Sequence, residues 1–273
     1  MNNEPVRCAL CGGVDFREVV PGGRGARVLR CGGCGLVRTI FPTGKAPSAG
    51  HYDKDYYAPW LGEQSAAREK IWNRRLKSIE RFVPAGRIFD VGCGDGMFLE
   101  VAAKAGWETE GSDISEWAAQ YARENRRLRV RAGELQNMDL PSDYYDAVTM
   151  WHVLEHVASP LVLLEKVRGM LKTGGLAVAA VPNASAIIYR AVYRIFKFRS
   201  SLSVVDREPH IHHFDPSTLR MIFDKAGFRV TEIIPDAGYA GALRKTLDAF
   251  PVALAAVSGI NISTAIEIRA IKK

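Results

Sequence analysis

Short apolar runs alternate with amphipathic stretches along the chain beyond residue 85. The apolar runs are typical of buried strands, and the amphipathic stretches are typical of helices. The expected strands are 87–91, a strand ending at Asp113, 128–132, 145–150, 176–181, 228–234 and 264–271. The expected helices are 97–105, one starting near Ser115, 160–171 and 218–226. This alternation predicts an α/β fold with a mainly parallel sheet, helices on both faces and ligands beyond the carboxyl ends of the strands.

The first 84 residues do not follow this alternation. Residues 1–41 hold paired cysteines, and residues 42–50 are rich in Pro, Gly and Ser, which predicts a linker. Apolar residues at helical spacing then predict a helix from about 63 to 82. We therefore expect a small module at 1–41, a linker and helical region at 42–84, and the α/β domain at 85–273.

Four of the five cysteines form two Cys-x-x-Cys pairs, each followed by a glycine: Cys8, Cys11, Cys31 and Cys34. This spacing is typical of a tetrahedral structural zinc site, and the glycines allow the tight backbone turns that such a site needs. A degenerate or redox-active pair and a disulfide framework are the weaker alternatives. The simplest role of zinc here is to hold together a segment too short to bury its own core.

The composition is that of an ordinary globular protein, with 47% hydrophobic and 25% charged residues, which excludes disordered and fibrous classes. The net charge of +7 permits an anionic partner without requiring one. Basic residues between and after the two cysteine pairs suit either a solvated face or a contact with RNA: Arg17, Arg24, Arg27, Arg30 and Arg38. The N-terminus does not resemble a signal peptide, and the uncharged run 249–266 is interrupted by Pro and Gly. A cytoplasmic protein is the expectation.

The strand 87–91 runs directly into a glycine loop, Gly92-Cys-Gly-Asp-Gly96, and then into a helix. Glycines let a ligand lie against the backbone at a helix N-terminus. Asp113, at the end of the following strand, is placed to accept both hydroxyls of a ribose. It has the alternative role of capping the helix near Ser115. The loop and the acidic strand end together predict a site for a nucleotide-type cofactor.

Several segments resemble the motifs of class I S-adenosylmethionine-dependent methyltransferases: 89–98, 111–115, 146–157 and 171–183. Residues 212–219 and 225–228 are similar to the C-terminal signature of a bacterial subfamily. Some of its members also carry N-terminal cysteine pairs before a Tyr-Asp-x-Asp-Tyr-Tyr stretch, which is present here at 52–57. The resemblance covers residues 8–271. It implies a Rossmann-like seven-stranded methyltransferase sheet beside a small zinc-ribbon-like module, with S-adenosylmethionine and structural zinc as cofactors.

The same resemblance implies roles for residues at the strand ends. The methionine and ribose part of the cofactor would be lined by Asp90, Gly92, Gly94 and Gly96. Asp113 would bind the ribose hydroxyls, Glu134 would lie near the adenine amino group, and Leu135 would lie against the ring. Trp151 and His152 would flank the methyl group, although packing in the core is an equal alternative for Trp151.

Histidines are the candidate bases, because an oxygen or carbon acceptor must lose a proton and an imidazole titrates near neutral pH. His152 and His156 follow the fourth expected strand of the domain, and a helical turn would put both on one face. We place His152 slightly ahead, since a capping role would account for His156. The stretch 209–213 holds three further histidines and suits a second metal site, substrate contacts or a loop anchor.

Residues 184–199 combine apolar positions at helical spacing with a basic face. They suit a lid, within an insertion at 184–213, or a peripheral contact with an anionic membrane.

Three functions remain open. The first is methyl transfer, at oxygen or carbon, to a small molecule such as a sugar, nucleotide sugar, lipid intermediate or secondary metabolite. The others are RNA methylation through the basic module, with nucleic acid the less favoured partner, and a non-catalytic cofactor-binding scaffold, which the intact cofactor motifs disfavour.

Overall fold

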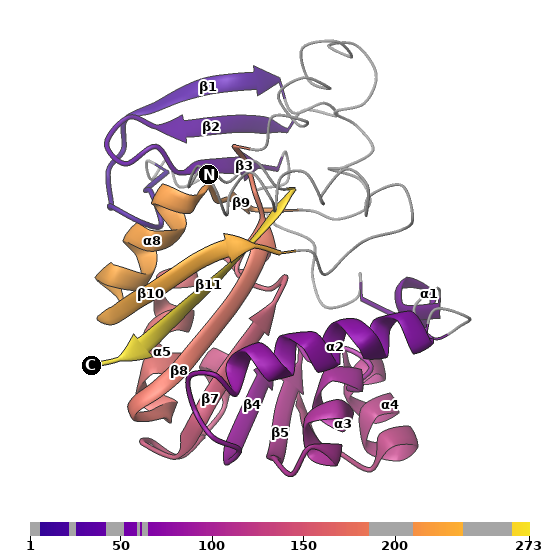
Figure 1. The fold of residues 1–273 in the computed structure, drawn as a ribbon. Helices are drawn as coiled ribbons and strands as arrows, with labels where there is room; N and C mark the ends of the chain where they lie inside the picture. The colour runs from indigo at the N-terminus through magenta and orange to yellow at the C-terminus, as the bar shows by residue number, and fades with distance from the viewer. Residues whose placement is uncertain are drawn as a thin grey trace.

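The computed structural model describes residues 6–21, 26–41, 52–58, 61, 65–185, 210–236 and 264–273. These residues form two sheets (Figure 1). The larger sheet has seven strands in the order β10-β11-β8-β7-β4-β5-β6, and the smaller has four in the order β1-β2-β3-β9.

The large sheet confirms the expected seven-stranded α/β fold. Its strands are β4 (Arg87–Val91), β5 (Glu108–Asp113), β6 (Arg129–Ala132), β7 (Tyr145–Trp151), β8 (Leu171–Pro182), β10 (Phe228–Pro235) and β11 (Ala265–Lys272). Strands β6, β5, β4, β7 and β8 are parallel, whereas β11 runs antiparallel to both β8 and β10. Their carboxyl ends therefore meet at one edge of the sheet, where an α/β fold binds its ligands.

Helices cover both faces of this sheet, as expected. One face carries α2 (Ser65–Ile79), α3 (Met97–Lys104) and α4 (Glu116–Arg126), and the other carries α5 (Pro160–Met170) and α8 (Pro216–Lys225). Neighbouring strand residues alternate between the two sides: Ile88 packs in the apolar cluster on the side of α2, α3 and α4, and Phe89 in the cluster on the side of α5 and α8. Because successive side chains of a strand point to opposite faces, the continuous apolar runs of the sequence are explained by burial on both sides.

Two short elements lie near the carboxyl edge of the sheet. They are the helical turn α1 (Lys54–Tyr57) and the 3₁₀ turn η3 (Leu135–Asn137). Asp53 caps α1 by accepting a hydrogen bond from the Tyr56 backbone N–H at 3.1 Å. The tyrosine-rich stretch is thereby held as a defined turn.

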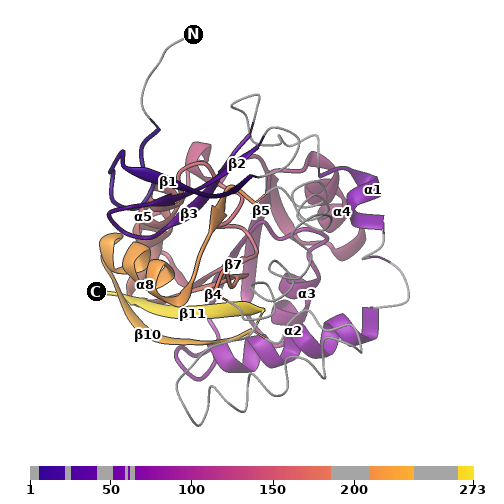
Figure 2. The same ribbon diagram turned by 90° about the horizontal axis from the view of Figure 1, so that it is seen from above.

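The small sheet contains β1 (Phe16–Pro21), β2 (Arg27–Cys31), β3 (Val37–Ile40) and β9 (His212–His213). Its fourth strand, β9, comes from a distant part of the sequence and pairs antiparallel with β3. Cys8, Leu10 and Leu36 share one apolar cluster with Phe214 and Phe223. Figures 1 and 2 show the small sheet on the same half of the molecule as α8, β10 and β11. The cysteine module is therefore packed onto the large sheet and shares its core.

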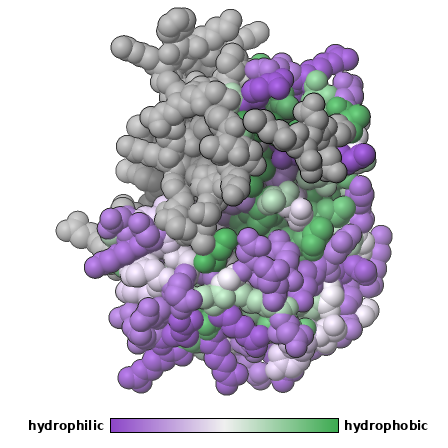
Figure 3. Space-filling view, turned by 180° about the vertical axis from the view of Figure 1, so that it is seen from behind, coloured by the Kyte–Doolittle hydropathy of each residue, from purple (hydrophilic) through white to green (hydrophobic). Residues whose placement is uncertain are grey.

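Among the described residues, no helix is long and apolar enough to cross a membrane. On the face seen in Figure 3, the lower part is mostly hydrophilic, and hydrophobic side chains gather in the middle. The predicted segment 184–199 lies outside the described residues except for Ala184 and Ser185, as does the insertion 184–213 up to residue 209. Most of the run 249–266 also lies outside them, and β11 begins within it, at Ala265.

Candidate active site

The glycine loop after β4 has a backbone that requires glycine. Gly92, Gly94 and Gly96 have φ angles of 68°, 54° and 77°, which side chains rarely tolerate. A Cβ atom at Gly92 would lie 2.6 Å from Val153 Cγ2, and one at Gly96 would lie 2.6 Å from Leu128 Cδ1. The loop is therefore folded tightly against the turn after β7 and against the end of α4.

Asp95, within this loop, is fixed by two arginines that sequence reasoning did not single out. Its carboxylate pairs with Arg68 at 2.8 Å and with Arg126 at 3.0 Å. Arg126 Nε also donates to the Asp95 carbonyl at 2.7 Å. These contacts tie the loop to α2 and α4, so that its shape is set before a ligand binds.

Asp113, at the end of β5, faces the glycine loop. Its carboxylate accepts hydrogen bonds from the backbone N–H groups of Gly94 at 2.8 Å and Ser115 at 2.9 Å, and from the Tyr57 hydroxyl at 3.4 Å. Burial raises the pKa of Asp113, and these hydrogen bonds oppose the shift. The N-cap of α4 is Ser115, which accepts from the Ala118 N–H at 3.2 Å. Ser115 rather than Asp113 therefore caps α4, and the Asp113 carboxylate faces the glycine loop.

Asp90 lies deeper than the other cofactor candidates. It is buried in β4 and accepts a 2.6 Å hydrogen bond from the Thr149 hydroxyl on β7. Burial raises the pKa of Asp90 to about 8, with the Thr149 hydrogen bond opposing it and the Asp113 charge adding to it. A cation bound at this edge would lower that pKa and favour the carboxylate form.

Glu134 and Leu135 open η3 after β6, with different environments. Glu134 is exposed, whereas the Leu135 side chain is buried in the apolar core. The Gly133 backbone N–H donates to the Asp113 carbonyl at 2.8 Å and holds this turn beside β5. Of the two predicted adenine contacts, only Glu134 presents its side chain at the surface.

The tyrosine-rich stretch crosses the edge of the sheet, a role that sequence reasoning missed. Tyr57 stacks on Trp117, with ring centroids 5.6 Å apart, and its ring edge lies 3.3 Å from where a Gly94 Cβ would be. At the other end of the stretch, the Tyr52 hydroxyl lies 3.3 Å from His156 Nδ1, and the Tyr52 carbonyl accepts from the Ser115 hydroxyl. The stretch therefore joins the Asp113 side of the edge to the His156 side. The aromatic cluster just before a helix was the available signal.

The prediction that His152 and His156 share a helical face is wrong. His152 has a φ angle of 58°, and the chain forms turns from there to α5. The His156 backbone N–H closes a turn on the Val153 carbonyl at 2.9 Å. The two imidazoles consequently have different partners.

His152 lies between two buried carboxylates. Its Nδ1 is 3.3 Å from Glu155 Oε1, and its Nε2 is 3.7 Å from Asp236 Oδ2. Burial alone would lower the pKa of His152, but Asp236 and Glu155 raise it to about 9. The structure therefore favours an imidazolium with a carboxylate at each nitrogen.

Arg75 completes this buried network. It pairs with Asp236 at 2.5 Å, with both side chains 3% exposed, and its guanidinium lies 4.3 Å from the centre of a Trp151 ring. Burial would raise the pKa of Asp236, but Arg75 and His152 hold it well below its usual range. Trp151 also packs edge-on against Phe98, with ring centroids 5.5 Å apart. Its packing in the core, the alternative considered from the sequence, is thus observed.

His156 belongs to a second cluster with Glu155 and His210. The ligand-type atoms of these three residues lie within 4.8 Å of one another, and the His156 and His210 ring centroids are 4.8 Å apart. Burial would raise the pKa of Glu155, but the hydrogen bond with His152 and the nearby histidines lower it. One carboxylate and two imidazoles form a donor set that suits a divalent transition metal.

The remaining histidines of the 209–213 stretch act as an anchor. His212 and His213 form β9, and burial lowers the pKa of each to about 4, which keeps both imidazoles neutral. His213 Nε2 is hydrogen-bonded to the Thr39 hydroxyl at 2.8 Å. The stretch thus contributes His210 to the cluster and His212 and His213 to the small sheet.

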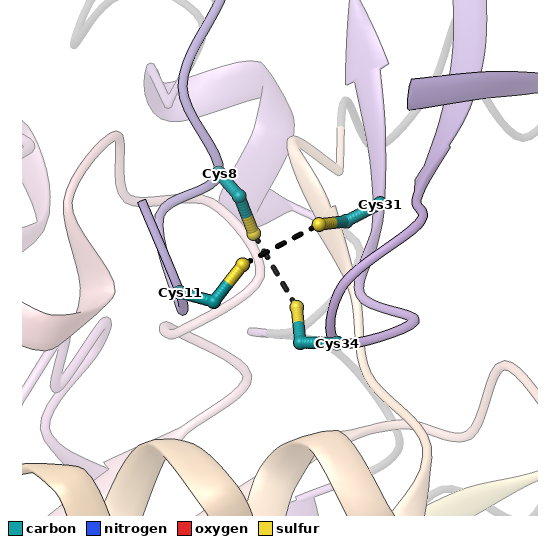
Figure 4. Close-up of side chains that lie close together, drawn as sticks. All are labelled: Cys8, Cys11, Cys31 and Cys34. Atoms are coloured by element: carbon teal, nitrogen blue, oxygen red, sulfur yellow. Dashed lines mark hydrogen bonds between the residues drawn. The ribbon is translucent and has the colours of Figure 1, made fainter. Parts of the chain in front are cut away.

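The four cysteines of the module converge as predicted (Figure 4). Cys8 and Cys34 have their sulfurs 3.5 Å apart, as do Cys11 and Cys31. These separations exclude S–S bonds of about 2 Å. They match a tetrahedron with Zn–S bonds of about 2.3 Å, whose edges are about 3.8 Å. Gly12 and Gly35 have φ angles of 79° and 81°, so the two knuckles turn as zinc knuckles require. The residues fit structural zinc.

A glycine loop after one parallel strand and a buried carboxylate at the end of the next are typical of an α/β fold that binds a nucleotide-type cofactor. A family model described as a methyltransferase domain matches residues 63–233, more than half of the chain. The chain belongs to this methyltransferase-domain family, and its fold is that of solved S-adenosylmethionine-dependent methyltransferases, which confirms the resemblance of its motifs.

Curated relatives carry the name ubiquinone biosynthesis O-methyltransferase. The protein from Ruegeria sp. is 34% identical over 123 residues, covering 43% of this chain and 49% of the relative. The protein from Hydrogenovibrio crunogenus is 28% identical over 185 residues, covering 63% of this chain and 76% of the relative. The chain thus spans about half the length of the first of these relatives.

Solved structures share the fold. An S-adenosylmethionine-dependent methyltransferase from Thermotoga maritima matches with a TM-score of 0.56 and 20% identity, covering 82% of this chain and 99% of the other. Magnesium protoporphyrin IX methyltransferase from Synechocystis, solved with bound S-adenosylhomocysteine, matches with a TM-score of 0.56 and 13% identity, covering 80% and 94%. At these identities the likeness concerns the fold alone.

Proposed function

We propose that this enzyme transfers a methyl group from S-adenosylmethionine to a hydroxyl of a small organic acceptor, with His156 as the base. The observation that carries the proposal is the convergence of His156, His210 and Tyr52 at the carboxyl end of β7. This group lies at the same sheet edge as Asp113 and the glycine loop, and the stretch 52–57 connects the two.

When bound, S-adenosylmethionine supplies an activated methyl group on a sulfonium. The chain then has to hold the acceptor in line with that group and to take the hydroxyl proton. Because Gly92, Gly94 and Gly96 have no side chains, the cofactor can lie against the backbone of their loop. Asp113 offers a carboxylate for the ribose hydroxyls. Asp90, Glu134, Leu135 and Trp151 remain predicted cofactor contacts.

The environments of the two candidate bases reverse the order expected from the sequence. His152 has a carboxylate at each ring nitrogen and a pKa raised to about 9, so it is protonated at neutral pH and is a poor base. His156 lies among polar side chains that converge on one point. We therefore assign proton removal to His156 and assign His152 to the support of Glu155.

The nature of the acceptor follows from the same reasoning and from the relatives. A histidine base suits a hydroxyl of moderate acidity, such as that of a phenol or catechol. Relatives named as O-methyltransferases of ubiquinone biosynthesis support an oxygen acceptor. Sugars, nucleotide sugars and acidic carbon atoms remain the other small-molecule acceptors to test.

The test is a methyl-transfer screen with cofactor labelled in the methyl group, using catechol, 3,4-dihydroxybenzoate, dTDP-glucose and total RNA as separate acceptors. We expect label in a small hydroxylated acceptor, and we expect His156→Asn to lower the rate by roughly 10²–10⁴. The matched variant His210→Asn alters the same cluster without removing the assigned base, and should cost less. Cofactor affinity, measured by calorimetry, should stay unchanged in both.

Label found only in RNA would overturn the small-molecule proposal in favour of the basic module as an RNA grip. Intact cofactor binding with no transfer to any acceptor would support the scaffold hypothesis. A wild-type rate of methyl transfer in His156→Asn would mean that another residue is the base.

A further inference from the structure

Strand β9 is held from both sides by hydrogen bonds. On one side, the Thr39 N–H of β3 donates to the Ile211 carbonyl at 2.8 Å. On the other side, the N–H groups of Ile211 and His212 donate to the Glu155 carbonyl at 2.8 and 3.0 Å. Residues 211 and 212 therefore bridge the cysteine module and the turn that carries Glu155 and His156.

A side-chain contact strengthens the same bridge. The Thr39 hydroxyl, in a side chain that is 2% exposed, is bonded to His213 Nε2 at 2.8 Å. The His213 and His210 ring centroids are 6.3 Å apart, and those of His210 and His156 are 4.8 Å apart. An unbroken series of contacts thus runs from Thr39 to His156.

The cysteines set the position of β3. Cys31 ends β2, its N–H donates to the Leu36 carbonyl at 3.0 Å, and β3 begins at the next residue, Val37. Leu36 is buried in the cluster that includes Phe214, and Lys225 Nζ donates to the Leu10 carbonyl at 2.5 Å. A metal bound by the four thiolates would therefore fix the β2–β3 turn against the residues that follow β9.

We propose that the cysteine module is a positioning element of the acceptor site, in which β3, through Thr39, holds β9 and thereby sets His210 against His156. The proposal deepens the proposed function, since it takes these histidines as the acceptor side of the site. Thr39 is a positioning residue, because it acts through His213. A module that only stabilised the fold would not couple selectively to these histidines.

The first experiment compares Thr39→Val with Thr39→Ser in the full chain. Valine matches the shape of threonine but lacks the hydroxyl, whereas serine keeps it. In ¹H–¹⁵N spectra of the imidazoles, Thr39→Val should shift the His213, His210 and His156 signals. Thr39→Ser should leave these signals at their wild-type positions. Zinc content and cofactor affinity should match the wild type in both variants.

With an acceptor in hand, Thr39→Val should lower methyl transfer by roughly tenfold, and Thr39→Ser should stay within about twofold. Unchanged His156 and His210 signals in Thr39→Val would overturn the proposal. A loss of cofactor affinity as large as the loss of methyl transfer would also overturn the proposal, because the substitution would then disturb the whole site and not only the acceptor side. The imidazole spectra do not depend on the acceptor, so failure of the acceptor screen leaves this test intact.

The second experiment removes the metal and follows amide hydrogen exchange. We expect exchange at 210–214 and at 37–40 to rise by roughly tenfold or more on zinc removal, while the glycine loop 92–96 keeps its protection. Unchanged exchange at 210–214, or an equal rise in the glycine loop, would contradict the proposal.

Discussion

The two halves of the sheet edge are built in different ways. The cofactor half consists of consecutive β–turn–α units between β4 and η3, and its key groups are the glycine backbone and Asp113. The other half, which we propose as the acceptor half, is assembled from segments far apart in the chain, which contribute Tyr52, Arg75, His156, His210 and Asp236. The first half relies on backbone geometry, and the second on charged side chains that meet only after folding.

This difference has an energetic consequence. The exposed pairs of the molecule, such as Arg87 with Glu108, gain little from their charges because water screens them. The acceptor half instead buries Arg75, Asp236 and Glu155 around the half-buried His152. Each of these groups depends on its partners, so we expect this half to respond more strongly to single substitutions and to pH.

The largest expected effect on stability comes from breaking the buried pair. Arg75→Met should lower the free energy of unfolding by about 3–5 kcal/mol, because it removes the guanidinium that pairs with the buried Asp236 carboxylate. Urea unfolding measures this. Arg87→Met, in the exposed pair, is the matched control and should cost less than about 1 kcal/mol. Equal losses in the two variants would remove the distinction between buried and exposed charges.

The next effect is a pH dependence due to His152. Its pKa rises from an ordinary value of 6.5 to about 9 on folding, so its contribution is fully present below about pH 6.5 and is lost as the pH rises through 9. We expect the stability advantage of the wild type over His152→Asn to shrink by about 2–3 kcal/mol between pH 6.5 and 9.5. Parallel stability curves for the two proteins would show that Glu155 and Asp236 do not hold an imidazolium.

A smaller effect is expected in the cofactor half. Asp113→Ala should weaken S-adenosylmethionine binding by about 1.5–3 kcal/mol, the range for hydrogen bonds to a charged group. Calorimetry measures the affinity, with Glu110→Ala on the same strand as the control. An unchanged affinity in Asp113→Ala would mean that another carboxylate binds the ribose. Arg75→Met should leave the affinity for the cofactor nearly unchanged. If it weakened binding as much as Asp113→Ala, the two halves of the sheet edge would not act independently.

The cysteine module shows how much of a structure a local sequence pattern can predict. Both knuckles and their convergence followed from the spacing of Cys8, Cys11, Cys31 and Cys34, because a zinc knuckle is a local turn with local ligands. Nothing local indicated that His212 and His213 complete the same sheet, since the pairing of β3 with β9 joins residues more than a hundred positions apart.

The erroneous expectation for His152 and His156 has a related cause. A spacing of four residues indicates a shared face only in a helix, and the positive φ angle of His152 ends that possibility at once. The His152 imidazole instead contacts Glu155 and, just after the end of β10, Asp236. The same contacts with carboxylates are the reason for which we propose His156, rather than His152, as the base.

The sequence by itself determined the elements whose causes are local: the strands buried on both faces, the glycine loop, the carboxylate after the second strand of the domain and the four-cysteine site. Apolar runs, positive φ angles and knuckle spacing act within a few residues, so they can be inferred without knowledge of the fold. Only the tertiary structure decided which charges meet, which histidine is enclosed by carboxylates and which strand completes the small sheet. Those outcomes depend on strand order and register between distant segments, and burial at their meeting points shifts the pKa values by amounts that no local pattern contains.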